Sequence, residues 1–241
     1  METTEQPSKT SKFGSIARGI GIVVVVAIIF YAIIASFNKK VTKSDKIWDK
    51  DMVIGNLDAE NYFIIYSDIA CPYCVAFENA IIENEKAFEN YIEENNVLVE
   101  VRVSDFLYEY GESHPHTSRD SAIAIYCAKE RGRFWDYYNL AITETWNNYF
   151  KEGGKPAVSE MSKLDLTYWE KLGTSIGLGD DFVDCVENGD PIEEIEANAL
   201  KSAKAINGMP YFKFNNYISS GFDLSWGWEY VLMYFDSGLK S

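Results

Sequence analysis

The stretch Ser67–Phe77 reads SDIACPYCVAF, with Cys71 and Cys74 separated by a proline and a tyrosine. It follows the apolar run NYFIIYS, whose β-branched and aromatic residues are typical of a buried strand. From Val75 to Glu94 the apolar residues recur at helical spacing. The cysteine pair is therefore predicted to lie at a turn from a strand to a helix.

The rest of the chain extends this pattern into an α/β fold. VLVEVRV (Val97–Val103) alternates as a strand does, and a strand–helix–strand unit of this kind has parallel strands. Five helical patterns follow: RDSAIAIYCAKERG, RFWDYYNLAITETW, KLDLTYWEKLGTSIG, DDFVDCVEN and PIEEIEANALKSAKAI. MPYFKFNN and YISSGF then predict a β-hairpin, and SWGWEYVLMYFDSG predicts a closing helix.

Residues 19–38, GIGIVVVVAIIFYAIIASFN, form an uncharged run. At about 1.5 Å per helical residue the run spans roughly 30 Å, the thickness of a bilayer's hydrocarbon core. A cleaved signal normally has a shorter apolar region, and a buried core helix is the remaining alternative. We expect an uncleaved membrane anchor between an N-terminal tail (1–18) and a charged linker (39–50), with the folded domain at 51–241. Basic residues flank the run on both sides and do not orient it.

Composition limits the classes of function. The chain has 241 residues, of which 47% are hydrophobic and 24% charged, as in a globular protein. Residues 41–241 hold 17 basic and 35 acidic residues, a net charge of −18. A domain of this charge repels nucleic acid, so nucleic-acid binding is not expected.

The turn itself favours a reactive sulfur. If the helix begins here, Cys71 is its N-cap and Pro72 occupies the first helical position, where a missing N–H is harmless. The free amides of Tyr73 and Cys74 can then donate to a thiolate at Cys71. Cys74, deeper in the helix, is expected to be the more buried and less acidic thiol.

Three uses of such a pair compete. A zinc site needs a second close pair, whereas Cys127 and Cys185 stand far apart in the sequence. A structural disulfide across so short a loop constrains the unfolded chain little. A redox-active dithiol is favoured, and neither a metal nor a cofactor is expected. His114 and His116 form the only histidine pair, and without a third ligand a solvent-exposed loop is the favoured interpretation.

The ordered set of motifs resembles the DsbA-like thiol-disulfide oxidoreductases of the thioredoxin superfamily. GNLDAENYFIIYSDIACPYCVAF is similar to the family's first strand and active site, and AIAIYCAKERGRFWDYYNLAI to its inserted helices. CVENGDPIEEIEANALKSAKAINGMPYFKFNN is similar to the stretch that ends in its cis-proline loop. The resemblance implies a thioredoxin-like α/β fold with a helical insertion at about 107–205, preceded here by one transmembrane helix.

The resemblance also implies particular site residues. Cys71 and Cys74 would be catalytic, and the Met209–Pro210 peptide bond would be cis, with client peptides pairing with the backbone of Met209. Pro72, Tyr73 and Asp68 would support the site, Asp68 either as a turn residue or as a proton carrier. Cys127 and Cys185 would form a structural disulfide, the alternative being two buried free thiols.

Two residues depart from the family's pattern. Tyr73 stands where the strongest oxidases have histidine, so a neutral phenol replaces a side chain that can favour the thiolate as an imidazolium. Ile65 stands where many relatives have a buried acid, six residues before the first cysteine. Proton transfer to and from Cys74 would then need water or another group.

From these features we expect a membrane-anchored enzyme that introduces disulfide bonds into exported proteins. The resemblance implies a bacterial cell, a cytoplasmic tail, a catalytic domain outside the cytoplasm, and a membrane re-oxidase of the DsbB or vitamin K epoxide reductase-like type. The first alternative is an extracytoplasmic reductase or isomerase that uses the same site. The second is a chaperone module that binds peptides without catalysis.

Overall fold

The computed structural model describes residues 47–241 apart from 112, 153–160, 162 and 207. The predicted tail, the predicted anchor and most of the predicted linker, residues 1–46, lie outside the described residues. Among the residues that are described, none forms a helix both long and apolar enough to span a bilayer.

A five-stranded sheet of order β1-β3-β2-β4-β5 forms the centre of the described chain. The strands are β1 (Val53–Gly55), β2 (Asn61–Ser67), β3 (Val97–Val103), β4 (Tyr211–Phe214) and β5 (Tyr217–Ser220). β2 runs parallel to β3, and the other three pairings are antiparallel. The strands predicted at 61–67 and 97–103, their parallel pairing and the C-terminal hairpin are confirmed. β1 is too short to show a pattern in the sequence and was not predicted.

Both faces of β2 are covered, because its side chains alternate between them. On one face Phe63 packs against α2 (Pro72–Ile82) and α11 (Trp228–Leu239), with its ring centroid 4.2 Å from that of Phe235. On the other face Tyr62 and Tyr66 are also buried. Burial on both sides explains why the run is apolar or aromatic at nearly every position.

The prediction of a single helix from Val75 to Glu94 is wrong in one respect. The structure has two helices here, α2 and α3 (Glu85–Glu94). Asn84 lies at the break, and its side-chain Nδ2 donates to the carbonyl oxygen of Ala80 at 2.9 Å. Asparagine side chains compete in this way with the backbone hydrogen bonds of a helix. The start of α2 follows the prediction, with Cys71 as its N-cap and Pro72 as its first residue.

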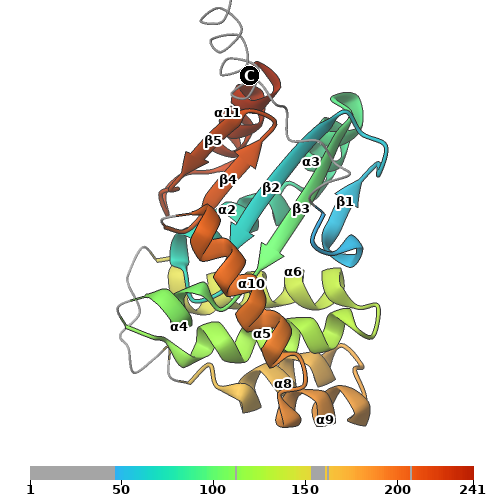
Figure 1. Ribbon diagram of the computed structural model, residues 1–241, viewed down its shortest axis with the longest axis vertical. Helices are drawn as coiled ribbons and strands as arrows, with labels where there is room; N and C mark the ends of the chain where they lie inside the picture. Colours follow the sequence, from blue (N-terminus) through green and yellow to red (C-terminus); the bar gives the residue numbers. More distant parts are fainter. Residues whose placement is uncertain (1–46, 112, 153–160, 162, 207) are drawn as a thin grey trace, which may run out of the picture. The chain divides into compact units, whose positions relative to one another are not determined.

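Helices fill the stretch between β3 and β4: α4 (Phe106–Tyr110), α5 (His116–Lys129), α6 (Phe134–Thr145), the π-helical turn η3 (Trp146–Phe150), α8 (Leu166–Ser175), α9 (Asp180–Asn188) and α10 (Ile192–Ala205). Figure 1 shows α5, α6, α8 and α9 at the end of the sheet where β2 and β3 finish. The five predicted helical segments correspond to α5, α6, α8, α9 and α10. The short helix α4 was missed for the same reason as β1. The turn after β2, which holds Cys71 and Cys74, therefore lies between the sheet and these helices.

The sheet's second face holds a buried ion pair. Arg102 and Glu100 on β3 are joined at 2.7 Å, and the Arg102 guanidinium lies 4.3 Å from the Trp48 ring centroid. The backbone N–H of Trp48 donates to Glu100, so contacts with the sheet begin before Asp51, where the folded domain was expected to start.

A disulfide joins two of the inserted helices. Cys127 on α5 and Cys185 on α9 are bonded, with their Cα atoms 5.9 Å apart. Both are buried, and neither lines the cavity described below. The bond therefore ties α9 to α5 away from that cavity.

Candidate active site

The turn between β2 and α2 positions the two free thiols. Cys71 has an extended backbone and caps the helix, and the backbone N–H of Cys74 donates to its sulfur at 3.3 Å. Cys71 is 4% exposed and Cys74 is 1% exposed. The order of burial is the one predicted, and the hydrogen bond is the one that a sulfur at an N-cap is expected to accept.

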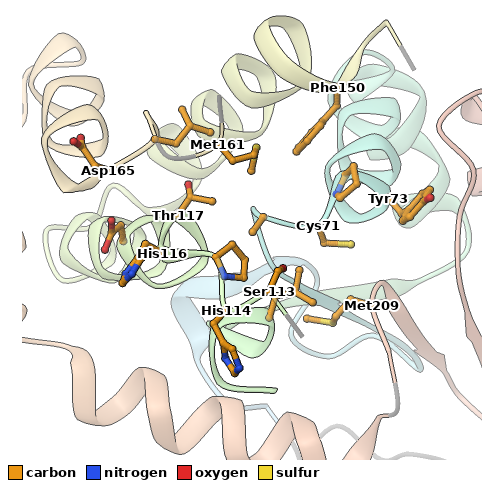
Figure 2. Close-up of a pocket in the computed structure, with 16 residues that line it drawn as sticks. Cys71, Tyr73, Ser113, His114, His116, Thr117, Phe150, Met161, Asp165 and Met209 are labelled. Atoms are coloured by element: carbon orange, nitrogen blue, oxygen red, sulfur yellow. The ribbon is translucent and has the colours of Figure 1, made fainter. Parts of the chain in front are cut away.

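A cavity of about 740 Å³ opens beside Cys71. Pro72, Tyr73 and Met209 line it with Cys71, whereas Cys74 does not. Figure 2 shows Cys71 and Met209 on the same side of the cavity. Cys71 is thus the thiol that an incoming molecule meets first.

The loop before β4 carries the predicted proline. The Met209–Pro210 peptide bond is cis, and the carbonyl oxygen of Pro210 accepts a hydrogen bond from the N–H of Gly221 at 3.0 Å. The structure therefore brings Met209 and Pro210, about 140 residues after the cysteines in sequence, to the same site as Cys71.

Glu78 is a buried acid that the sequence analysis did not select. It lies on α2 four residues after Cys74, so the two side chains are neighbours on the same face of the helix. Glu78 is 4% exposed, and the Tyr138 hydroxyl of α6 donates to its Oε2. The Ser67 hydroxyl lies near, and among the described residues neither it nor Oε1 has a hydrogen-bond partner.

The surroundings of Glu78 and Cys74 destabilise the charged form of each side chain. Burial raises the pKa of Glu78 to about 7, although the Tyr138 and Ser67 hydroxyls favour the ionised form. Burial and the adjacent Cys71 sulfur raise the pKa of the Cys74 thiol, and the Glu78 charge adds to the effect. The site therefore contains a carboxyl group that gains and loses its proton near neutral pH, one helical turn from Cys74.

Ile65 is buried in the apolar core of the sheet, as its residue type requires. Glu78 on α2 is buried as well, although no role was predicted for it from the sequence. Its spacing of four residues from Cys74 was the available signal. The spacing alone did not show that α6 would cover this face of α2.

Asp68 is completely buried, and its side chain accepts hydrogen bonds from the turn, from α4 and from α5. Its carboxylate accepts hydrogen bonds from the N–H of Ala70 at 2.9 Å, from the N–H of Leu107 at 2.8 Å and from the Ser118 hydroxyl at 2.6 Å. Burial raises the pKa of Asp68 to about 6. Two roles were predicted for Asp68, and these contacts support its role as a turn residue. Asp68 also ties the turn to α4 and α5.

His114 and His116 line the cavity, together with Ser113, Pro115 and Thr117 from the same loop and helix start. Within the described ranges no group of three or more histidine, cysteine or acidic side chains is arranged to hold a metal ion. The contribution of the two histidines to this site is to form part of the wall of the cavity.

The sequence model of one family matches residues 48–221 and is described as Thioredoxin. The chain belongs to the thioredoxin family. No curated protein matches its sequence.

Three solved structures share the fold of this thioredoxin-family chain. Alpha-DsbA1 of Wolbachia pipientis is 15% identical with a TM-score of 0.58, and the match covers 82% of this chain and 95% of that one. Oxidised BdbD of Bacillus subtilis is 19% identical with a TM-score of 0.54, covering 79% and 93%. MdbA of Corynebacterium diphtheriae, a thiol-disulfide oxidoreductase, is 21% identical with a TM-score of 0.52, covering 77% and 90%.

These likenesses show a DsbA-like thioredoxin fold. In this thioredoxin-family chain the Cys-Pro-Tyr-Cys turn places two free thiols at the start of α2.

Replacing Glu78 by Gln is expected to stabilise the oxidised protein at pH 8 and to leave its stability almost unchanged at pH 4. The pKa of Glu78 is higher in the folded chain, about 7, than its ordinary value of 4.5. The wild-type protein therefore loses stability as the pH rises from about 4.5 through about 7, by ~3 kcal/mol. Urea unfolding at a series of pH values measures the difference in free energy of unfolding.

Glu83→Gln is the matched control, because Glu83 is exposed at the end of the same helix. The oxidised form is used because Cys74 then has no proton to lose. A stability difference between wild type and Glu78→Gln that does not change with pH would contradict the assignment of a raised pKa.

Proposed function

We propose that this protein is a membrane-anchored oxidoreductase that introduces disulfide bonds into exported proteins. The observation that carries the proposal is the thiol pair at the start of α2, where Cys71 borders a cavity and Cys74 lies deeper. The likeness to DsbA proteins and to MdbA, a thiol-disulfide oxidoreductase, supports this chemistry.

The reaction is an exchange of sulfur–sulfur bonds. A client thiolate attacks Cys71 Sγ of the disulfide form, the bond to Cys74 breaks, and Cys74 leaves with the electron pair. A second client thiolate then attacks the client's own sulfur in the mixed disulfide and releases Cys71 as a thiolate. The client loses two electrons and closes its disulfide, and the protein gains them as a dithiol.

Glu78 completes this exchange as the proton carrier for Cys74. The leaving Cys74 sulfur is buried, where its negative charge is poorly solvated, so it takes up a proton. A carboxyl group with a pKa of about 7, one helical turn away, can supply that proton and accept it again when the dithiol is re-oxidised. Glu78 thus takes the place of the acid that Ile65 does not provide.

Pro72, Tyr73 and Met209 shape the side of the cavity next to Cys71. The backbone of Met209, beside the cis peptide bond to Pro210, would pair with an extended client segment as an added strand. This pairing would hold a client cysteine near Cys71.

The reaction would take place outside the cytoplasm, next to the cell membrane. Residues 19–38 would anchor the chain, with residues 1–18 in the cytoplasm and the catalytic domain outside it, in a bacterial cell. The Cys127–Cys185 disulfide supports an oxidising compartment. A membrane re-oxidase of the DsbB or vitamin K epoxide reductase-like type would return the dithiol to the disulfide.

The reduction potential of the Cys71–Cys74 couple is expected to lie well above about −180 mV, the range of a disulfide donor. Full-length protein in detergent is equilibrated with glutathione buffers, and the alkylated Cys71–Cys74 peptide is quantified by mass spectrometry. A value near −270 mV would mean that the protein reduces its clients, and the reductase or isomerase alternative would replace the oxidase. Undiminished activity on clients in a Cys71→Ser variant would instead support the non-catalytic chaperone.

Glu78→Gln is expected to slow re-oxidation of the dithiol at Cys74 about tenfold or more at pH 7, since a proton acceptor is removed. In the wild type this rate should rise with pH through about 7, because only the ionised carboxyl accepts a proton. Stopped-flow oxidation by glutathione disulfide measures the profile, with Glu83→Gln as control. An identical pH profile in Glu78→Gln would remove Glu78 from the mechanism.

Full-length protein expressed in bacteria is expected to stay with the membrane fraction after an alkaline carbonate wash. A C-terminal epitope tag should be digested by protease added outside spheroplasts. A variant lacking residues 1–40 is expected in the wash supernatant. Release of the full-length chain by carbonate would argue against the anchor, and a protected tag would argue against the orientation.

A further inference from the structure

The cavity beside Cys71 has an apolar wall and an acidic end. Leu107, Phe150 and Met161 contribute apolar side chains to the wall, and Asp120 and Asp165 lie among the other lining residues. Among the described residues that line it, there is no lysine or arginine. The cavity therefore combines hydrophobic surface with negative charge.

The charge of Asp165 acts on the carboxyl group of Asp120. Asp120 lies on α5, and Asp165 caps α8 by accepting a hydrogen bond from the N–H of Tyr168 at 3.0 Å. Burial raises the pKa of Asp120 to about 6, with the Asp165 charge raising it and His116, one turn earlier on α5, lowering it. At neutral pH Asp120 is mainly ionised, and a cation beside it would offset the unfavourable effect of the Asp165 charge.

The arginine next to Asp120 in the sequence is engaged elsewhere. Arg119 forms ion pairs with Asp105, Glu109 and Glu196. Its charge contributes least among the causes that shift the pKa of Asp120. The groups that favour the ionised form of Asp120 are His116 first, then the backbone N–H of Leu166 and Arg119.

A polar group without a partner lies on the same wall. The Thr117 side chain is 2% exposed, and its hydroxyl has no hydrogen-bond partner among the described residues. In Figure 2 it extends from the start of α5 toward the space between α5 and Met161. A buried hydroxyl of this kind normally has a partner, so it points independently to a polar ligand in the cavity.

We propose that the cavity selects client segments that carry a lysine or arginine close to the reacting cysteine. The aliphatic part of that side chain would lie along the apolar wall, and its charged head would lie between Asp120 and Asp165 within reach of the Thr117 hydroxyl. The cavity, at about 740 Å³, would hold roughly 25 water molecules at ~30 Å³ each, enough for one long side chain with part of its backbone. This inference rests on the proposed oxidation of clients at Cys71.

The test uses full-length oxidised protein in detergent micelles with short dithiol peptides at pH 7 and ~0.15 M salt, where long-range attraction is screened. The residue beside the first cysteine is Lys, norleucine or Glu, and a fourth peptide carries its Lys at the far end. The second-order rate constant of peptide oxidation is measured for each. The order expected is Lys beside the cysteine, then norleucine, then Glu, with the distant Lys equal to norleucine.

Asp120→Asn and Asp165→Asn separate the cavity from other effects of lysine, including a larger thiolate fraction in the peptide. Both substitutions keep the shape of the side chain, and asparagine also caps helices. Each is expected to lower the Lys-to-norleucine rate ratio about fivefold, the upper range for one partly exposed ion pair. Asp184→Asn, which removes an exposed charge on α9 away from the cavity, should leave the ratio unchanged.

Two outcomes would overturn the inference in distinguishable ways. If the wild type oxidises all four peptides and the ratio is the same in both cavity variants, the selectivity for basic residues is wrong and the oxidase remains. If the wild type oxidises none of them, the proposed function fails and the inference fails with it.

Discussion

The buried carboxylate of Asp68 holds the reactive turn in place. One of its oxygens accepts from Ala70 within the turn, and the other accepts from Leu107 on α4 and Ser118 on α5. Its backbone carbonyl also accepts from the N–H of Cys71 at 2.9 Å. A single side chain therefore fixes the conformation of the backbone before Cys71. It also connects the end of β2 to α4 and α5, which provide one wall of the cavity. These hydrogen bonds favour the ionised form and partly offset its burial.

Two other buried acids show how surroundings separate structural from reactive carboxyl groups. Glu100 on the sheet's second face has an ion pair with Arg102 and a hydrogen bond from the Tyr62 hydroxyl, and it also accepts from the backbone of Trp48. Glu78 has only the Tyr138 hydroxyl as a hydrogen-bond partner in the described chain, and its pKa lies near neutrality. Because buried polar and charged groups need partners, these contacts suit Glu100 to hold the sheet together. Glu78 is suited to exchange a proton.

The strands and the start of α2 follow from local patterns. A strand buried on both faces is recognised from its β-branched and aromatic residues, and β2 and β3 were predicted correctly in this way. Cysteine followed by proline marks a helix start for two reasons. The N-cap has an extended backbone and a side chain that accepts a hydrogen bond, and the first helical residue can lack an N–H. Short elements such as β1 and α4 depend on neighbouring elements for their stability and leave no pattern of their own. The break at Asn84 depends on one side-chain hydrogen bond that periodicity does not reveal.

By itself the sequence determined the strand–turn–helix around Cys71, the order of the major elements and the acidity of the domain, since each depends on residues that are close in the chain or on composition. Only the tertiary structure decided that Glu78 faces inward, because α6 covers that side of α2 and Tyr138 meets its carboxyl group. It also decided that Asp120 and Asp165, from two different helices, share a cavity with Cys71. Positions of this kind depend on packing between distant segments, and the burial that packing creates raises the pKa values of Glu78 and Asp120.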